Sequence, residues 1–221
     1  MICWIRLVNF LLLIENNINY TKKIIDSGQT PQIVYELCSC IRETFCLSYS
    51  IRKTNFLYLF FQKKNTLIKF DGANLRYLGP DERSQALLLE KALNKVKNEN
   101  KVKNDIWIKS TPGIYVRKFF DTSSFIDFYR SIALGKSIIL TDNSYILEEN
   151  VEEFNLNKTV IKIMENDFFI IPIYTITTKN FRIIESIKEV KNIKLLSLSK
   201  IKKVENKILY INFRKDQQRT L

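Results

Sequence analysis

Apolar residues occur in short runs separated by polar segments, and the spacing within each run predicts the type of element. Nearly continuous apolar runs, typical of strands buried on both faces, cover residues 7–14 and 55–62. Alternation over residues 66–70 predicts a third strand, joined to the second by a hairpin turn at Lys63-Lys64-Asn65. Residues 31–48 begin with proline and carry apolar side chains at helical spacing, which predicts an amphipathic helix.

The same alternation of element types continues along the rest of the chain. We predict helices over residues 84–96, 125–134 and 181–190, and strands over residues 107–108, 114–116, 137–140, 160–163, 168–174, 195–198 and 208–211. Gly135 is expected to be the C′ residue that ends the second of these helices. Strands that alternate with helices indicate an α/β fold, and a length of 221 residues predicts one domain over residues 1–221.

Two blocks concentrate the residues that constrain the backbone. Residues 76–84 read Arg-Tyr-Leu-Gly-Pro-Asp-Glu-Arg-Ser, which predicts a strand stopped by Gly79-Pro80 and then a helix that starts near Asp81. Residues 110–117 read Ser-Thr-Pro-Gly-Ile-Tyr-Val-Arg, which predicts a Pro-Gly turn between two short strands. We therefore expect two loops of defined shape in this part of the chain.

The composition limits the partners of the chain. The formal net charge of +12 favours a polyanionic partner. The alternative is that a Lys- and Asn-rich composition spreads lysines as a solvated coat with no binding role. The apolar run at residues 7–14 is too short to cross a bilayer and no small-residue cleavage site follows it, so neither a membrane span nor a signal peptide is expected.

The four cysteines are expected to be buried free thiols in a reducing cytoplasm. Cys3, Cys38, Cys40 and Cys46 match neither a zinc spacing nor a disulfide framework. The chain contains no histidine that could complete a mixed metal site, so no metal is expected.

The two central blocks resemble the archaeal tRNA (pseudouridine-54 N1)-methyltransferase family, a dimeric branch of the knotted SPOUT methyltransferases. Weaker matches extend the resemblance over most of the chain, at residues 38–41, 47–52, 70–75, 135–140 and 194–199. The resemblance implies a SPOUT-like sheet with flanking helices and a C-terminal trefoil knot. It also implies a cytoplasmic protein that forms a homodimer or, as an alternative, pairs with an intact paralogue.

The resemblance implies S-adenosylmethionine as the cofactor, held by main-chain groups. The residues that match the cofactor-contacting loops are Leu140, Thr141, Leu196, Ser197, Leu198 and Ser199. The family also uses a Gly-Asp-His-x-Gly turn, and here the best placement of that turn is at residues 172–176, with an alternative register at residues 164–168. Neither segment contains glycine, and no glycine follows Gly135. Main-chain contacts tolerate such side-chain changes, but β-branched residues at 172–176 favour an extended strand.

The resemblance implies that the two central blocks shape the dimer and the substrate-side surface. The candidates for contact with RNA phosphates are Arg52, Arg83 and Arg117, because a guanidinium binds phosphate in a bidentate manner. Arg83 is alternatively a structural partner of Asp81, Glu82 or a backbone carbonyl.

Other residue roles remain open between function and structure. Tyr49 and Tyr115 either stack on a base or pack in the core. Asp81 is either a general base or, more in keeping with its position, a helix-start residue. The family's Gly-Arg-x-Asp element at the first helix is Gln32-Ile33-Val34-Tyr35 in this chain, and its late His/Cys segment is Lys207-Ile208. The general base is therefore not assigned.

Two functions follow from these observations. The first is methylation of N1 of pseudouridine in the tRNA T-loop, with S-adenosylmethionine as methyl donor. The second is a catalytically inactive SPOUT relative that binds RNA or pairs with an intact paralogue, which the missing glycines and histidines favour.

Overall fold

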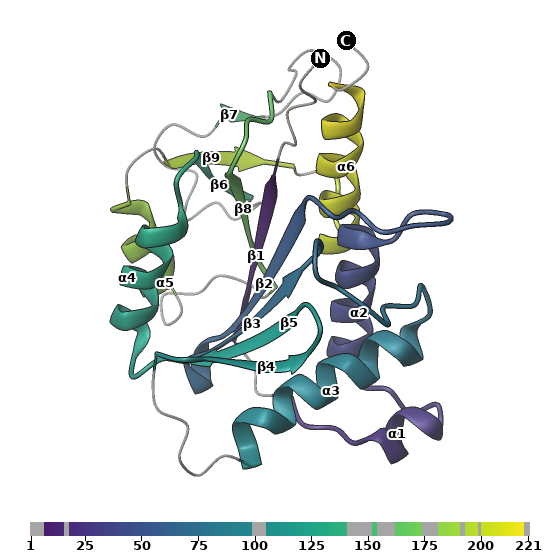
Figure 1. Ribbon diagram of the computed structural model, residues 1–221. Helices are drawn as coiled ribbons and strands as arrows, with labels where there is room; N and C mark the ends of the chain where they lie inside the picture. The colour runs from purple at the N-terminus through teal and green to yellow at the C-terminus, as the bar shows by residue number, and fades with distance from the viewer. Residues whose placement is uncertain are drawn as a thin grey trace.

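The computed structural model describes residues 7–15, 18–98, 105–140, 152–153, 162–173, 181–190, 193–198 and 200–218. A mixed sheet of nine strands, in the order β4-β5-β3-β2-β1-β8-β6-β9-β7, forms the centre of the molecule (Figure 1). The strands are β1 (Val8–Ile14), β2 (Asn55–Phe61), β3 (Thr66–Asp71), β4 (Trp107–Thr111), β5 (Ile114–Lys118), β6 (Ser137–Leu140), β7 (Glu152–Glu153), β8 (Asp167–Pro172) and β9 (Ile193–Ser197). The α/β fold class predicted from the sequence is confirmed.

Helices cover both faces of this sheet, which gives three layers (Figure 1). The helices are α1 (Lys22–Asp26), α2 (Gln32–Phe45), α3 (Glu82–Asn98), α4 (Thr122–Ile132), α5 (Phe181–Lys188) and α6 (Val204–Gln217), with a short 3-10 turn, η1 (Gln62–Lys64), between β2 and β3. The helices α2, α3 and α6 pack on one face, and α4 and α5 pack on the other. The short α1 lies against α3, where the hydroxyl of Tyr20 donates to the carbonyl of Ala86 at 2.7 Å.

The alternation of side chains along β1 explains why its sequence is apolar throughout. Phe10 and Leu12 belong to the core under α2, α3 and α6, whereas Leu11 and Leu13 belong to the core under α4 and α5. All seven residues of β1 are buried, since β2 and β8 flank the strand and helices cover both of its faces. The prediction of a central first strand is confirmed.

The direction of the strands determines where a ligand site can form. The six neighbouring strands β2, β1, β8, β6, β9 and β7 are all parallel, so their carboxyl ends share one edge of the sheet, called here the carboxyl edge. In open α/β sheets, ligands bind in crevices at this edge. Strand β3 is antiparallel to both β2 and β5, so β5 also ends at the carboxyl edge.

Four sequence predictions differ from the structure. Residues 208–211 belong to helix α6, and no strand precedes Gly79, because the chain forms turns and bends after Asp71. Helix α4 reaches its C-cap at Ala133, so Gly135 is not the C′ residue. A side chain at 135 would lie 2.6 Å from the backbone of Asn166, so glycine is needed there for close packing. Of the strand predicted at residues 160–163, the described residues 162–163 are not in a strand.

Candidate functional site

Four of the six predicted cofactor residues lie at the carboxyl edge. Leu140 is the last residue of β6 and pairs in register with Leu196 of β9. Ser197 ends β9, Leu198 follows it, and β8 lies on the other side of β6. These residues are at most 6% exposed, so a ligand at this edge would meet their main-chain groups rather than their side chains. Thr141 and Ser199 lie outside the described residues.

The two sequence placements of the glycine-free loop lie at opposite edges of the sheet. Residues 172–173 are at the carboxyl edge, where the amide of Ile173 donates to the carbonyl of Leu13 at 2.9 Å and extends the ladder of β8. Residues 174–176 lie outside the described residues. The alternative register at 164–168 forms the turn that enters β8, so it lies away from Leu140 and Ser197.

A cleft of about 280 Å³ opens at the carboxyl edge, between the first turns of α2 and α6, and we call it the edge cleft. Its lining residues are Gln32, Tyr35, Glu36, Ser39, Cys40, Ile173, Lys202, Lys203, Val204 and Glu205. Ile173 connects this cleft to the end of β8. The edge cleft therefore lies next to the strands whose ends carry the predicted cofactor residues.

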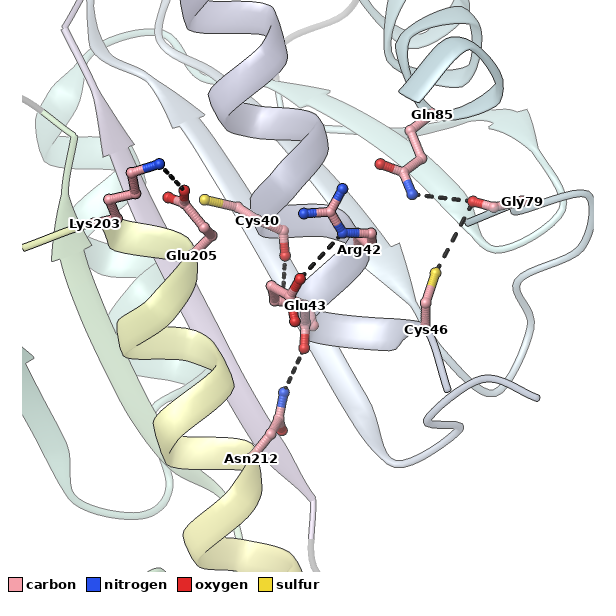
Figure 2. A network of polar contacts seen from close by, with 10 residues as sticks. Cys40, Arg42, Glu43, Cys46, Gly79, Gln85, Lys203, Glu205 and Asn212 are labelled. Carbon is pink, nitrogen blue, oxygen red and sulfur yellow. Dashed lines mark hydrogen bonds and ion pairs between the residues drawn. The ribbon is translucent and has the colours of Figure 1, made fainter. Parts of the chain in front are cut away.

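Charged and polar groups of both signs line the edge cleft. The amide of Gln32 donates to the Glu36 carboxylate at 3.1 Å, and the Lys203 ammonium lies 3.9 Å from the Glu205 carboxylate. Figure 2 shows Lys203 and Glu205 directed toward each other at the start of α6, beside Cys40 of α2. The side chain of Glu205 is only 16% exposed, whereas that of Lys203 is 73% exposed. Carboxylates placed in this way can accept hydrogen bonds from the hydroxyls of a bound sugar.

The cysteine in the edge cleft is a buried thiol that resists deprotonation. Burial raises the pKa of the Cys40 thiol well above its usual value, and nearby carboxylates, Glu205 first, raise it further. A thiol that stays protonated is a weak nucleophile and a weak metal ligand. Cys38 is likewise a buried free thiol, as expected from the sequence, while Cys46 is free and partly buried.

A buried polar network fixes α6 against α2 below the edge cleft. The amide of Asn212 donates to the backbone carbonyl of Glu43 at 2.8 Å, a contact that Figure 2 also shows. Asn55, at the start of β2, donates to Asn212 at 2.9 Å and to the carbonyl of Thr44 at 2.8 Å. The ammonium of Lys215 donates to Asn55 at 2.8 Å. Because these groups are buried and bonded to one another, the two helices that form the cleft hold a fixed relative position.

All three candidate RNA-binding arginines form ion pairs within the chain. Arg52 lies 2.6 Å from Asp216 of α6, Arg83 lies 2.8 Å from Asp26 of α1, and Arg117 lies 3.4 Å from Asp105. The ion pair of Arg83 is thus with Asp26. The pKa of the Asp81 carboxyl is lowered first by the backbone hydrogen bond from Ser84, and the charge of Arg83 also helps to lower it. The guanidinium of Arg117 also lies over aromatic rings, 4.9 Å from the centre of Phe119 and 4.5 Å from that of Phe128. Contact of these arginines with RNA stays a prediction.

The first signature block and the turn that begins the second lie at the opposite edge of the sheet from the edge cleft, and the second block then runs along β5 toward the carboxyl edge. The carbonyl of Gly79 accepts hydrogen bonds from Gln85 at 3.0 Å and from the Cys46 thiol at 3.9 Å, as Figure 2 shows. Asp81 accepts a hydrogen bond from the backbone amide of Ser84 at 2.8 Å, which confirms its role as a helix-start residue. Tyr49 is fully exposed in the neighbouring loop and Tyr115 is partly buried.

Sequence reasoning missed four of the polar residues that line the edge cleft: Glu36, Ser39, Lys203 and Glu205. The last two lie at or next to the start of α6, where a strand was predicted slightly further along. The helical spacing of the buried residues Ile208, Ile211 and Lys215 is the signal that could have revealed this helix.

The described parts of the chain contain no group of three or more His, Cys, Asp or Glu residues arranged to hold a metal ion. Within the same parts, no helix has the length and apolar character needed to span a membrane.

Comparison with known proteins identifies a family and several relatives that this chain resembles. Residues 34–199 match a family described as "Putative SAM-dependent RNA methyltransferase". A tRNA (pseudouridine(54)-N(1))-methyltransferase of Methanocaldococcus jannaschii is 39% identical over 85 residues, which cover 37% of this chain and 42% of that protein. A protein of the same name from Haloferax volcanii is 37% identical over 82 residues, 37% of this chain and 39% of that protein.

The matches to these relatives span about two fifths of their length. The family match is much longer and includes most of α2, both signature blocks, and the strands β6, β8 and β9 that end at the carboxyl edge. Since this match extends over most of the chain, the protein belongs to that family of SAM-dependent RNA methyltransferases.

Proposed function

We propose that the protein transfers a methyl group from S-adenosylmethionine to N1 of a pseudouridine in the T-loop of tRNA. The observation that carries this proposal is the edge cleft, which opens where β8 ends at the carboxyl edge of the sheet, the same edge at which Leu140 and Leu196 lie. The names of the curated relatives support the substrate and the modified atom. A function in tRNA modification would also suit a cytoplasmic protein.

The residues around the edge cleft fit the cofactor. The cleft volume of about 280 Å³ is close to the lower end of small-molecule sites, which begin at about 300 Å³. Glu36 and Glu205 would accept hydrogen bonds from the ribose hydroxyls. Main-chain groups at Leu140 and at residues 196–198 would contact the parts of S-adenosylmethionine other than the ribose. When bound, S-adenosylmethionine supplies an electrophilic methyl group on its sulfonium.

The target base needs help to lose the proton from N1, because this N–H is only weakly acidic. The chain contains no histidine. Lys202 and Lys203 line the edge cleft, and positive charge there would favour the deprotonated base. With the cofactor in the cleft, the opening of the cleft would hold the base in line with the methyl group, and such alignment of two bound reactants supplies a large part of the catalysis.

The proposal includes a homodimer and a C-terminal trefoil knot within a single domain. Large apolar side chains are exposed on α6 and α2: Leu209 is 46% exposed, Phe213 is 54% exposed and Tyr35 is 48% exposed. Leu209 and Phe213 are four residues apart and therefore share one side of α6. An apolar strip next to the edge cleft supports a dimer that places a second subunit beside the substrate.

Calorimetric titration with S-adenosylmethionine tests the cofactor site. We expect a micromolar dissociation constant, and we expect Glu205→Gln to weaken it about tenfold, since charge-assisted hydrogen bonds contribute about 1.5–3 kcal/mol. Glu185→Gln, an exposed glutamate on α5, is the matched control and should leave the dissociation constant unchanged. Absence of binding up to millimolar cofactor would contradict the proposal.

The second candidate function is a non-catalytic relative that binds RNA or pairs with an intact paralogue. It is favoured by the absence of glycine from residues 136–221 and by the ladder hydrogen bond of Ile173, which keeps the chain extended where the resembled family has a turn. The same titration separates the two candidates, because this second function predicts no cofactor binding.

A further inference from the structure

A second cleft, of about 470 Å³, opens at the turn between β2 and β3, and we call it the lysine cleft. Its lining residues are Phe61, Lys63, Lys64, Asn65, Thr66, Leu93, Val96, Lys118, Phe119 and Phe120. Three of these residues are lysines and none carries a carboxylate. The lysine cleft is therefore a positively charged hollow with apolar and aromatic walls.

Two of the lysines at this cleft lack the carboxylate partners that the three arginines predicted to bind RNA have among the described residues. Lys63 and Lys118 are exposed, and neither forms an ion pair with a carboxylate of a described residue. Arg52, Arg83 and Arg117 each have a carboxylate partner. A cation that must first leave an internal carboxylate binds phosphate less readily, so Lys63 and Lys118 are better placed to do so.

The backbone holds these lysines in a fixed arrangement. Asn65 closes the turn after η1 in the left-handed conformation, with a φ of 46°. Its carbonyl accepts a hydrogen bond from the amide of Phe119 at 2.7 Å, and its side chain donates to the carbonyl of Phe120 at 3.5 Å. The turn that carries Lys63 is thereby joined to the segment that carries Lys118. Phe120, at the rim, is 75% exposed although it is a large apolar residue.

The lysine cleft and the edge cleft open at the same edge of the sheet. The lysine cleft lies at the carboxyl ends of β2 and β5, and the edge cleft lies at the carboxyl end of β8. Only β1 separates β2 from β8, so the two strand ends are about 10 Å apart at a spacing of about 4.8 Å per strand. A helix of the α2, α3 and α6 layer contributes to each cleft.

We infer that the lysine cleft binds the phosphate backbone of an RNA whose target base lies in the edge cleft. This inference rests on the proposed function, because it takes RNA as the substrate. Lys63 and Lys118 contact phosphates, which positions the RNA without reading its sequence. Phe120 offers an exposed ring on which an unpaired base stacks.

The test is binding of a fluorescently labelled tRNA transcript, measured by anisotropy at several salt concentrations. We compare Lys63→Gln/Lys118→Gln with the control Lys22→Gln/Lys23→Gln, which removes two exposed lysines from α1. Both variants lose two positive charges, so any decrease in RNA affinity that depends only on net charge is equal in the two. Helix α1 packs near the start of α3, whereas the lysine cleft contains Leu93 and Val96 near its end, about 10–15 Å further along the helix.

We expect the cleft variant to bind the transcript about tenfold more weakly than the control, with the slope of log affinity against log salt reduced by about 2. Equal loss of affinity in the two variants would overturn the inference. The inference would also be overturned if poly-glutamate displaced the labelled transcript as effectively as unlabelled RNA does at equal charge, because the surface would then suit an acidic protein.

The cofactor titration separates this inference from the proposed function. The cleft variant should retain the wild-type affinity for S-adenosylmethionine, which also shows that it is folded. A wild-type protein that binds RNA through Lys63 and Lys118 but binds no cofactor would refute the methyltransferase function and leave the RNA surface standing. A protein that binds cofactor and the transcript, with equal transcript affinity in the cleft and control variants, would refute the RNA surface and leave the methyltransferase function standing.

Discussion

Among single residues, Asn55 contributes most clearly to the packing of α6 on the sheet. Its buried side-chain amide donates hydrogen bonds to Thr44 and Asn212 and accepts one from Lys215. We predict that Asn55→Ala lowers the free energy of unfolding by about 3 kcal/mol, because it leaves the buried Lys215 ammonium and the Thr44 carbonyl each without one hydrogen-bond partner. Urea denaturation measures the change. Asn94→Ala is the control, since the part-buried side chain of Asn94 donates to Glu90 one turn away on α3, and its loss should cost less than about 1 kcal/mol.

Asp81 gives the fold a dependence on pH. Hydrogen bonds, first from the backbone amide of Ser84, lower the pKa of this carboxyl from its ordinary value of 3.8. A carboxyl with a lowered pKa in the folded state stabilises the fold above its unfolded pKa, and that contribution is lost as the pH falls through the folded pKa. We predict that Asp81→Ala costs about 1 kcal/mol at pH 7, and that the difference from wild type shrinks below about pH 4.

Thermal unfolding followed over a range of pH measures this effect. Asp81→Asn is the matched variant, because asparagine retains the helix cap but cannot titrate. Its stability relative to Asp81→Ala should not change with pH. A wild-type advantage over Asp81→Ala that persists unchanged at low pH would contradict the assignment.

At the scale of elements, the turn between β4 and β5 is fixed to the loop after β3. Gly113 has a φ of 80°, and a side chain there would lie 2.4 Å from the backbone nitrogen of Leu75. The amide of Asp71 donates to the carbonyl of Gly113 at 2.8 Å. We predict that Gly113→Ala separates the two loops and lowers the free energy of unfolding by more than about 2 kcal/mol.

Gly28→Ala is a matched control for this substitution. Gly28 has a similar φ of 72°, but an added side chain would meet nothing within 4 Å. Its cost should be limited to the conformational strain, about 1 kcal/mol. If urea denaturation gives the same loss for both variants, close contact at Gly113 is not the cause.

The elements that were predicted correctly are those whose type is determined by the hydrophobic pattern or turn residues within the element itself. The apolar run of β1, the hairpin at Asn65 and the apolar positions of α2 each carry a local signal. Residues 76–78 do not form a strand: β3 already has β2 and β5 on its two sides, and the chain after it instead bonds the turn between β4 and β5, where the amide of Arg76 donates to the carbonyl of Pro112. That outcome depends on contacts distant in sequence.

Helix α6 shows why part of the site was not predicted. Its buried positions include Lys207, Asn212 and Lys215, polar residues that a search for an apolar helical face passes over. The ammonium of the buried Lys215 donates hydrogen bonds to Thr54 and Asn55, which lie about 160 residues away in the sequence. The positions of Leu140 and Leu196 at the carboxyl edge agree with the resemblance. The edge cleft was not predicted, because residues at the start of α6 form part of its wall and the sequence analysis did not predict that helix.

At the scale of the whole molecule, the exposed apolar strip on α6 predicts a dimer. We predict that wild type sediments as a dimer and that Leu209→Glu/Phe213→Glu sediments as a monomer, because two buried charges at the interface would cost several kcal/mol. Phe120→Glu, which changes a 75% exposed phenylalanine away from α6, is the control and should remain a dimer. Wild type that is monomeric at all concentrations would contradict the dimer.

The central claim is that the edge cleft supports methyl transfer to pseudouridine. The most direct measurement is incubation of the purified protein with S-adenosylmethionine and a tRNA that contains pseudouridine in the T-loop, followed by mass spectrometry of its nucleosides. We predict one methyl group on that pseudouridine, and none on a transcript with uridine at the same position. Recovery of unmethylated pseudouridine, from a protein that binds the same tRNA, would contradict the account.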